Sequence, residues 1–250
     1  MSNSLLAIVL LENPATPDMS VIAKALRTRY PGLPVEMSGD PRSSPLIQCG
    51  GELVAVMSMP APMPDDPGLW ARTASIWPEG KTIAARSRGH LIVSVLGKDR
   101  PPLVTARLNT AVVGALIATI PGCCGVVWAG KVARPAKLWL DMSTQSFAPF
   151  PDYPFTLWVD ILPFRSDRGI GAVTMGLDAF AGREIEFETA RLPLSELIDK
   201  VTGLAAYLVE HGNVVKDGDT FGGDERERFT ARHRKSERFG GMPVLFCATD

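Results

Sequence analysis

The chain has 250 residues, of which 46% are hydrophobic and 21% are charged, so its composition is that of a folded globular protein. A largely disordered chain would be poorer in apolar residues, and a collagen-like chain would be far richer in glycine. The formal net charge of −1 excludes a general electrostatic attraction for nucleic acid or anionic lipid. We therefore expect a soluble protein that binds neither nucleic acid nor membranes.

The cysteines and the first apolar run indicate a cytoplasmic protein. Cys123 and Cys124 are adjacent, Cys49 and Cys247 stand apart, and a chain of this length does not depend on disulfides. We expect all four thiols to be reduced. The run Leu5–Leu11 lacks the basic segment and the small-residue cleavage site of a signal peptide, so it predicts a buried strand instead.

Apolar runs and turn residues predict alternating strands and helices up to residue 142. The predicted strands are Leu5–Leu11, Val35–Met37, Leu46–Cys49, Leu53–Met59, His90–Leu96 and Gly125–Trp128, and the predicted helices are Pro17–Tyr30, Gly68–Trp77, Pro102–Ile120 and Pro135–Met142. Gly50 and Gly51 lie between two of these strands and are typical of a two-residue hairpin turn. This hairpin implies antiparallel pairing.

After the Pro- and aromatic-rich link Phe147–Pro154, the chain is rich in strands. Alternating apolar residues predict strands at Phe155–Leu162, Gly171–Met175 and Glu184–Glu188, which we expect to form an antiparallel meander. Apolar residues at helical spacing then predict a long amphipathic helix at Pro193–His211.

The two halves of the chain share an order of elements. In each half a strand leads to an Arg-x-Pro-Leu sequence, at Arg100–Leu103 and Arg191–Leu194, and then to a helix, a glycine and a further strand. This order suggests an internal duplication, with halves at about residues 1–148 and 152–250. We predict an α+β protein with antiparallel or mixed sheets and helices packed on one face, folded as a single compact domain over residues 1–250.

Common catalytic motifs are absent from the sequence. There is no nucleophile elbow, no H-E-x-x-H zinc motif and no zinc-deaminase motif. The segment Glu79–Thr82 ends like a phosphate-binding loop, but Ser75 occupies the position of the required first glycine.

The densest polar segment spans residues 216–224 and is called the acidic loop. Its candidate functional residues are Lys216, Asp217, Asp219, Thr220 and Asp224. The D-x-D-x-x-G spacing is similar to the start of a calcium-binding loop. Phe221 and Arg228 occupy positions where further ligands would be needed, so we expect a Gly-Asp turn and no metal, with a weak magnesium site as the alternative.

Histidines and tryptophans supply the candidate interface or pocket residues, which are Trp77, His90, Trp158, Asp160 and His233. His90 opens a predicted buried strand, where a structural histidine is commoner than a base or a ligand. Trp158 alternates with the apolar row of its predicted strand, beside Asp160. It therefore either packs under a helix or forms an exposed binding anchor.

Several segments resemble the bacterial domain-of-unknown-function family 4261. The clearest are Phe155–Asp160, Gly176–Phe180, Leu204–Leu208 and His211–Thr220, and Met59–Met63 and His90–Val95 are similar as well. The resemblance implies kinship over most of the chain but carries over no catalytic residue. It makes Lys216–Thr220 the first segment to test.

The lack of catalytic motifs and the many aromatic and Pro-rich segments predict a non-catalytic protein-binding module of immunity or accessory type, without a cofactor. The alternative is a small-molecule or metal-dependent enzyme that uses the acidic loop with His90 or His233. A third interpretation is a structural protein whose duplicated halves form a homodimer.

Overall fold

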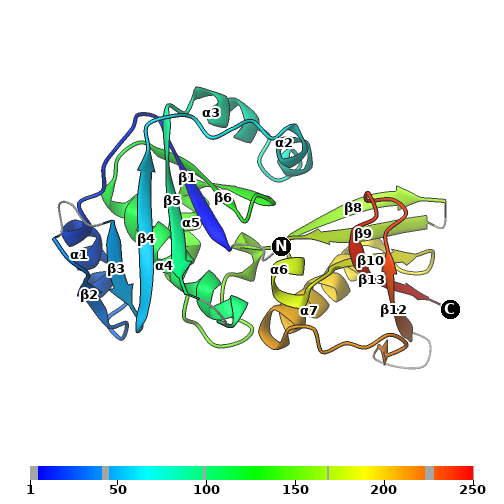
Figure 1. Cartoon of the computed structure of the whole chain (residues 1–250). Helices are drawn as coiled ribbons and strands as arrows, with labels where there is room; N and C mark the ends of the chain where they lie inside the picture. Colours follow the sequence, from blue (N-terminus) through cyan, green and yellow to red (C-terminus); the bar gives the residue numbers. More distant parts are fainter. Residues whose placement is uncertain (1–4, 41–44, 98–99, 168, 223–227, 250) are drawn as a thin grey trace. The chain divides into compact units, whose positions relative to one another are not determined.

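The computed structural model describes residues 5–40, 45–97, 100–167, 169–222 and 228–249. The chain clusters into two compact units, Met1–Leu157 and Trp158–Asp250, and each unit has its own sheet (Figure 1). Helices accompany antiparallel and mixed sheets, which confirms the predicted α+β class. The single domain and the duplicated halves stay predictions.

Within the described residues, the first unit contains a seven-stranded antiparallel sheet with the order β2-β3-β4-β5-β1-β6-β7. The strands are β1 Leu6–Leu11, β2 Val35–Met37, β3 Leu46–Cys49, β4 Glu52–Met59, β5 Gly89–Leu96, β6 Cys123–Trp128 and β7 Val132–Pro135. Gly50 and Gly51 join β3 to β4 with φ values of 59° and 83°. Two positive φ values suit the twist of a two-residue hairpin, so the predicted hairpin is confirmed.

Helices cover both faces of this sheet. They are α1 Met19–Arg29, α2 Pro67–Thr73, α3 Gly80–Arg86, α4 Pro102–Thr119 and α5 Ala136–Ser143, followed by the 3-10 turn η1 Phe155–Leu157. Trp128 of β6 contacts Trp139 of α5, whereas its neighbour Val127 packs with Trp70 and Trp77 from the α2–α3 segment. Because neighbouring strand residues point to opposite faces, α5 and the α2–α3 segment lie on opposite faces.

The predicted helix Gly68–Trp77 is wrong at its end. Asp66 caps α2 by accepting a backbone hydrogen bond in the first turn, and the helix stops at Thr73. A second short helix, α3, then begins at Gly80. A Cβ atom at Gly80 would lie 2.9 Å from two ring atoms of Trp77, so the glycine leaves room for this indole at the start of the helix.

The helix α4 is, among the described residues, the one long and apolar enough to cross a membrane by length and composition. Within the fold 56% of this helix is buried, and core helices of soluble proteins can have the same length and composition. Its fully buried Asn109 donates a hydrogen bond to the carbonyl oxygen of Leu5 at 2.7 Å. This bond ties the core helix to the residue before β1.

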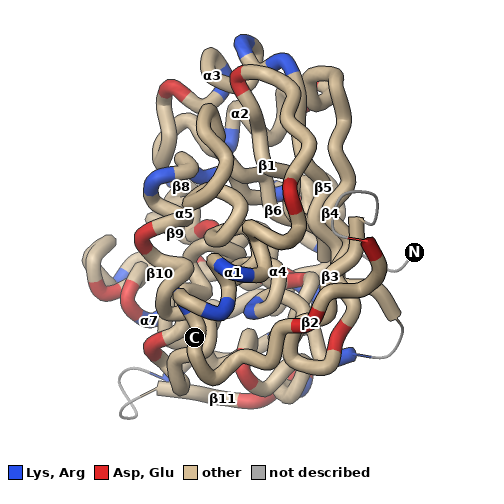
Figure 2. The backbone as a smooth tube through the Cα atoms, turned by 90° about the vertical axis from the view of Figure 1, so that its left-hand side faces the viewer, with Lys and Arg blue, Asp and Glu red and all other residues tan. Residues whose placement is uncertain are grey.

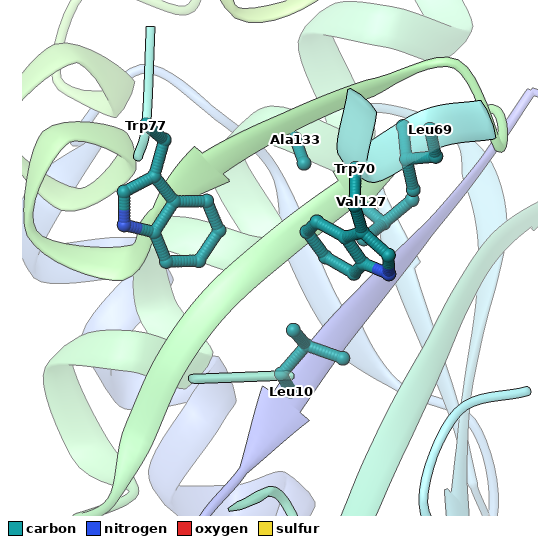
Figure 3. Packing of buried hydrophobic residues seen from close by; sticks show 6 residues of the cluster. All are labelled: Leu10, Leu69, Trp70, Trp77, Val127 and Ala133. Carbon is teal, nitrogen blue, oxygen red and sulfur yellow. The ribbon is translucent and has the colours of Figure 1, made fainter. Parts of the chain in front are cut away.

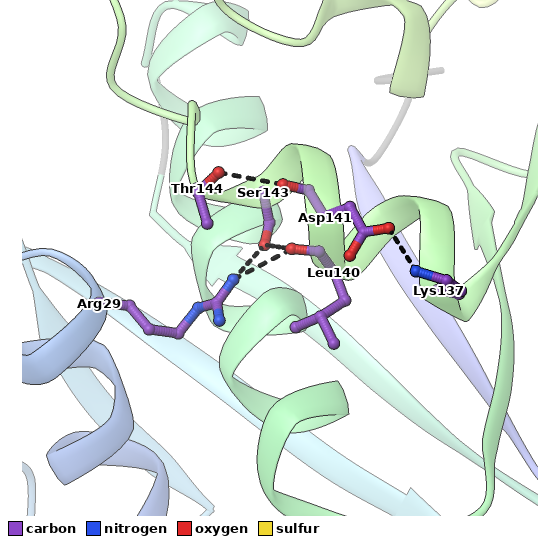
Figure 4. Close-up of polar contacts among 6 residues, drawn as sticks. All are labelled: Arg29, Lys137, Leu140, Asp141, Ser143 and Thr144. Atoms are coloured by element: carbon purple, nitrogen blue, oxygen red, sulfur yellow. Dashed lines mark hydrogen bonds and ion pairs between the residues drawn. The ribbon is translucent and has the colours of Figure 1, made fainter.

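Polar contacts join α1 to the end of α5 (Figure 4). Arg29 Nη2 donates to the carbonyl oxygen of Leu140 and to Ser143 Oγ, at 3.0 Å each. The hydroxyl of Tyr30 donates to the carbonyl oxygen of Ser143 at 2.7 Å. Carbonyl groups at a helix end lack partners in the backbone ladder. Arg29 and Tyr30, at the end of α1, therefore add donors to those that Ser143 and Ser146 supply to the same carbonyl oxygens.

Within the described residues, the second unit contains a six-stranded mixed sheet with the order β11-β12-β13-β10-β9-β8. Its elements are β8 Asp160–Ser166, β9 Gly169–Met175, α6 Asp178–Ala181, β10 Glu184–Thr189, α7 Leu194–His211, β11 Thr220–Phe221, β12 Phe229–Lys235 and β13 Pro243–Thr249. β8, β9 and β10 form the predicted antiparallel meander, and β10 pairs with β13 in parallel. α7 packs against β8, β9 and β10.

The predicted strand Phe155–Leu162 is wrong in its first part. Phe155–Leu157 forms a 3-10 turn, in which the backbone N–H of Leu157 donates to the carbonyl oxygen of Pro154 at 2.9 Å. Regular pairing starts only at Asp160, opposite Met175. The alternation of apolar residues at 155–159 therefore reflects burial in a turn and not the period of a strand.

Candidate functional site

Residues 216–219 of the acidic loop form a turn, in which the carboxylates of Asp217 and Asp219 accept hydrogen bonds from backbone N–H groups. Asp219 Oδ2 accepts from the N–H of Lys216 at 2.8 Å, and Asp217 Oδ1 accepts from the N–H of His233 at 2.7 Å. Thr220 Oγ1 accepts from Arg228 at 3.3 Å. These contacts fit a Gly-Asp turn. Asp224 lies outside the described residues.

The histidines lie in different surroundings. His233 is in β12 beside the acidic loop, and its Nε2 is 3.0 Å from the carbonyl oxygen of Val215. His90 belongs to the first unit, where its ring is buried and its Nδ1 is 2.8 Å from the carbonyl oxygen of Ala61. The structure thus brings His233 next to Asp217 and gives His90 a backbone partner of its own.

The candidate interface tryptophans Trp77 and Trp158 are buried. Trp77 packs with Trp70, with ring centroids 6.3 Å apart, against the face of the seven-stranded sheet that lies opposite α5 (Figure 3). Trp158 is fully buried and stacks on Phe180 at 5.7 Å, and Asp160, at the start of β8, is buried as well. Packing, and not exposure on a sheet, is therefore the role of Trp158.

A polar cavity of about 260 Å³ lies on the sheet of the second unit. Its lining residues are Ser166, Asp167, Glu186, Glu188, Arg234, Glu237 and Arg238, and they define what is here called the Glu–Arg pocket. The side chains of Asp167 and Glu237 are exposed, whereas Glu186 and Glu188 are buried. The pocket therefore has a buried acidic wall and an exposed acidic rim.

The period of β10 places the glutamates on one face. Phe187 contacts Phe229 at 4.7 Å, and Lys200 of α7 lies 5.5 Å over the Phe229 ring, so Phe187 points to the α7 side. Glu186 and Glu188 alternate with Phe187 and therefore point to the opposite face. Both faces of the strand are buried, so β10 carries charge into a region that water reaches poorly.

Two aromatic rings support the arginines of the pocket. Arg234 lies 3.3 Å over the ring of Phe246, and Arg238 lies 5.0 Å over the ring of Phe164. Phe164 can lie across β9 because Gly171 is beneath it: a Cβ atom there would come within 2.5 Å of a ring atom. Cation–π contacts of this kind contribute about 0.5–2 kcal/mol and hold a guanidinium group flat on the ring.

The two arginines form only long ion pairs with the glutamates. Arg234 Nη2 is 3.9 Å from Glu186 Oε1, and Arg238 Nη2 is 3.5 Å from Glu188 Oε1. Charge-assisted hydrogen bonds are normally about 2.7–2.9 Å long. These pairs thus compensate charge without using the hydrogen-bonding capacity of the carboxylates.

Glu184 shows how a buried glutamate of the same strand is satisfied. Its carboxylate accepts from Thr174 Oγ1 at 2.8 Å and from the backbone N–H groups of Gly176 and Leu177 at 2.7 and 3.0 Å. By contrast, Glu186 is only 2% exposed, and its Oε2 accepts no hydrogen bond from the described residues. The carboxylate of Glu184 is therefore satisfied within the fold, whereas one acceptor of Glu186 is unused by the described residues.

A larger cavity of about 690 Å³ contains part of the acidic loop. Its lining residues include Asp219 and Thr220 of the loop, Lys200 and Tyr207 of α7, and Phe221. Most of the remaining lining is apolar. Volumes of about 300–1,000 Å³ are usual for small-molecule sites.

The thiols lack the properties of nucleophiles. Burial raises the pKa of Cys49 and of Cys123 to about 12, and it also raises the pKa of Cys124 and Cys247. A raised pKa suppresses the thiolate, which is the reactive form. Among the residues that the structure describes, no three His, Cys, Asp or Glu side chains group together in a way that would hold a metal ion.

Sequence reasoning missed the Glu–Arg pocket, although a signal for it was present. The order Glu184-Ile-Glu-Phe-Glu188 places three acids on one strand face, whereas the strand is predicted from its apolar members Ile185 and Phe187. Their arginine partners come from the other side of β13, nearly 50 residues along the chain. Such a pairing depends on strand order, which no local pattern specifies.

Comparison with known proteins identifies one family. Residues 173–245 match the family described as Domain of unknown function (DUF4261), which confirms the predicted resemblance. No curated protein and no solved structure matches the chain significantly. The matched segment includes β10, α7, β12 and five residues of the Glu–Arg pocket, namely Glu186, Glu188, Arg234, Glu237 and Arg238.

Proposed function

With residues 173–245 assigned to the domain-of-unknown-function family 4261, we propose that the protein is a non-catalytic protein-binding module that receives a cationic group of its partner in the Glu–Arg pocket. The observation that carries this proposal is the free acceptor on Glu186, at the wall of a cavity. An unpaired buried acceptor costs about 1–3 kcal/mol, and more when it is charged. A partner that donates a hydrogen bond to Glu186 removes this cost.

The size of the pocket favours a side chain over a free metabolite. Its volume of about 260 Å³ lies below the range of about 300–1,000 Å³ that is usual for small-molecule sites. A single long side chain from another protein fits such a volume. Interfaces typically gain most of their free energy from a few side chains that fill pockets of this kind.

The charge of the pocket favours a cationic group. Four acidic side chains line it, Asp167, Glu186, Glu188 and Glu237, against the two arginines Arg234 and Arg238. Over the whole chain the charges nearly balance, and Figure 2 shows acidic and basic positions interspersed along the tube. The excess of acid is thus a local property of the pocket, which suits specific recognition.

We propose the cytoplasm of a bacterial cell as the place of action, and an immunity or accessory role. The four cysteines are free, as is usual where thiols are kept reduced. The lack of a catalytic motif in the sequence is consistent with a role that depends on binding alone. These finer assignments rest on composition and family resemblance.

Affinity capture with matched variants tests the proposal. The tagged protein is used as bait in a lysate of its source cells, and bound proteins are quantified by mass spectrometry. We expect one stoichiometric partner. Glu186→Gln and Glu188→Gln should each lower the captured amount of this partner at least tenfold, because glutamine removes the charge of the carboxylate but keeps the shape of the side chain. Glu36→Gln, at an exposed position of β2, is the matched control and should retain the partner.

Two outcomes would contradict this assignment. A partner retained by both pocket variants would place the interface elsewhere on the protein. Failure to capture any partner, together with a concentration-dependent rise in molecular mass, would instead favour a homodimer.

The larger cavity supports a second candidate function, a small-molecule binder or enzyme that uses the acidic loop. Its volume of about 690 Å³ suits a metabolite, and Asp219 and Thr220 line it. Gly203 also lines this cavity, and a Cβ atom there would meet nothing within 4 Å. A metabolite that raises Tm for the natural protein but not for Gly203→Leu, which fills the cavity, would support this alternative.

A further inference from the structure

We propose that the cationic group received by the Glu–Arg pocket is the guanidinium of an arginine side chain, which bridges Glu186 and Glu188. This inference rests on the proposed function and names the chemistry of the partner at the same site. It follows from the spacing of the two carboxylates, from the free acceptor on Glu186, from the loose ion pair of Glu188 and from the pocket's own arginines.

The spacing of the two carboxylates suits a planar hydrogen-bond donor that can bond one carboxylate at each of two edges. Glu186 and Glu188 occupy alternate positions of β10, so their backbones are about 6.5–7 Å apart along the strand. Guanidinium carries five N–H donors in a fixed plane, so it can bond one carboxylate at each edge. Ammonium is a compact charge with three donors, and it would satisfy one carboxylate well and the other poorly.

The two carboxylates are bonded only loosely, so a guanidinium group can form stronger bonds with them. Glu186 Oε2 is buried without a hydrogen-bond partner among the described residues, and the described residues form only a 3.5 Å ion pair with Glu188. A bound arginine would replace these loose contacts with charge-assisted bonds of normal length. Because the acids are already buried, binding adds only the desolvation of the incoming group and not that of the carboxylates.

The pocket already accommodates guanidinium groups. Arg234 and Arg238 lie over Phe246 and Phe164, and their side chains are 36% and 40% exposed. They therefore act as weak internal competitors for the same carboxylates. Arg238 is the more easily displaced of the two, because it sits farther from its ring and at the exposed turn after β12.

Titrations of the full chain with capped amino acids test this assignment. The probes are N-acetyl-arginine amide, N-acetyl-lysine amide and the neutral isostere N-acetyl-citrulline amide, and binding is followed by ¹⁵N–¹H NMR. We expect the arginine probe to shift the amides of β10 and β12 with a roughly millimolar Kd, as suits a ligand of this size. The lysine probe should bind several-fold more weakly, and the citrulline probe should cause no saturable shift.

Variants with opposite expected effects make the test sharp. Glu186→Gln should weaken arginine binding at least tenfold, whereas Arg238→Gln should strengthen it several-fold by removing the competitor. A purely structural role of these residues would not produce the gain. Because Arg238 is exposed, Arg238→Gln keeps the test decisive even if Glu186→Gln does not fold. Glu36→Gln should leave the Kd unchanged.

The remaining outcomes separate this inference from the proposed function. Equal binding of the arginine and citrulline probes, or no effect of Arg238→Gln, overturns the arginine assignment. Partner capture that still depends on Glu186 would then leave the protein-binding function standing. Free arginine binding much more tightly than the capped probe would identify a small molecule as the source of the guanidinium and would overturn a protein occupant.

Discussion

Gly114 and Gly203 lie in helices of equal length but in different surroundings. A Cβ atom at Gly114 in α4 would lie 2.7 Å from Ser143 Cβ, whereas one at Gly203 in α7 would meet nothing within 4 Å. We expect Gly114→Ala to lower the free energy of unfolding by about 1–3 kcal/mol through overpacking. Gly203→Ala should raise it by about 0.5–1 kcal/mol, because alanine favours helix.

Urea unfolding followed by circular dichroism measures both effects. Each variant serves as the control for the other, because the chemical change is identical. Effects of the same sign would show that the contact between α4 and α5 leaves room for a methyl group at Gly114.

The reactivity of the cysteine thiols provides a test of their burial. Since burial raises the pKa of Cys49 and Cys123 to about 12, both remain thiols at pH 8. We expect the folded protein to react with an aromatic disulfide reagent many times more slowly than the protein unfolded in urea. Cys123 and Cys124 are half-buried and Cys49 and Cys247 are buried, so rapid reaction of all four thiols in the folded protein would show that the buried pair is exposed by local opening.

At the scale of elements, the junction of α1 and α5 tests which polar contacts stabilise the first unit. Arg29 joins the two helices through two hydrogen bonds, whereas Lys137 pairs with Asp141 within α5 and its side chain is 85% exposed. We expect Arg29→Met to lower the free energy of unfolding by about 1–3 kcal/mol. Lys137→Met should change it by at most about 0.5 kcal/mol, because water screens the exposed pair.

Thermal and urea unfolding of the two variants decide this point. Losses of similar size would mean that the contacts of Arg29 are no more valuable than a surface ion pair. Arg29 lies in α1 and Lys137 in α5 (Figure 4), but arginine, lysine and methionine have similar helix propensities, so differences of helix propensity largely cancel.

Sequence patterns predicted most elements because the apolar residues of each element follow either the period of a strand or that of a helix. The strands β1, β3 and β5 and the helices α1 and α7 begin and end within a few residues of the predicted bounds. The split at α2 and α3 was missed because the capping by Asp66 and the packing of Trp77 on Gly80 involve contacts that periodicity does not record. At Phe155–Leu157 the apolar alternation is genuine, but tertiary burial produces it in a turn.

At the scale of the whole molecule, the thiols make stability depend on pH. Their pKa values are raised from the ordinary 9.0 to about 12 for Cys49 and Cys123 in the folded state. Between pH 9 and pH 12 the unfolded thiols ionise and the folded ones do not. The free energy of unfolding should therefore be unaffected by them below pH 9 and fall above it, by up to about 1.4 kcal/mol per pH unit for each thiol.

Urea unfolding at pH 8, 9, 10 and 11 measures this slope. The variant Cys49→Ala removes one thiol, so its slope above pH 9 should be smaller by up to about 1.4 kcal/mol per pH unit. An unchanged slope would attribute the alkaline loss of stability to other groups, such as lysines and tyrosines.

The sequence by itself determined the α+β class, the hairpin at Gly50 and Gly51, the meander β8–β10 and the turn at residues 216–219. Each of these depends on residues close together in the chain, whose conformational preferences act locally. Only the tertiary structure decided that Trp77 and Trp158 are buried, because exposure depends on which distant elements cover a side chain.

The Glu–Arg pocket was likewise decided by tertiary structure. β13 lies between β10 and β12, and this order lets Arg234 reach across Phe246 towards Glu186. The side-chain period of β10 can be derived from the sequence, but the neighbour of a strand is set by long-range pairing. A binding site assembled from charges on separate strands therefore becomes visible only once the sheet is known.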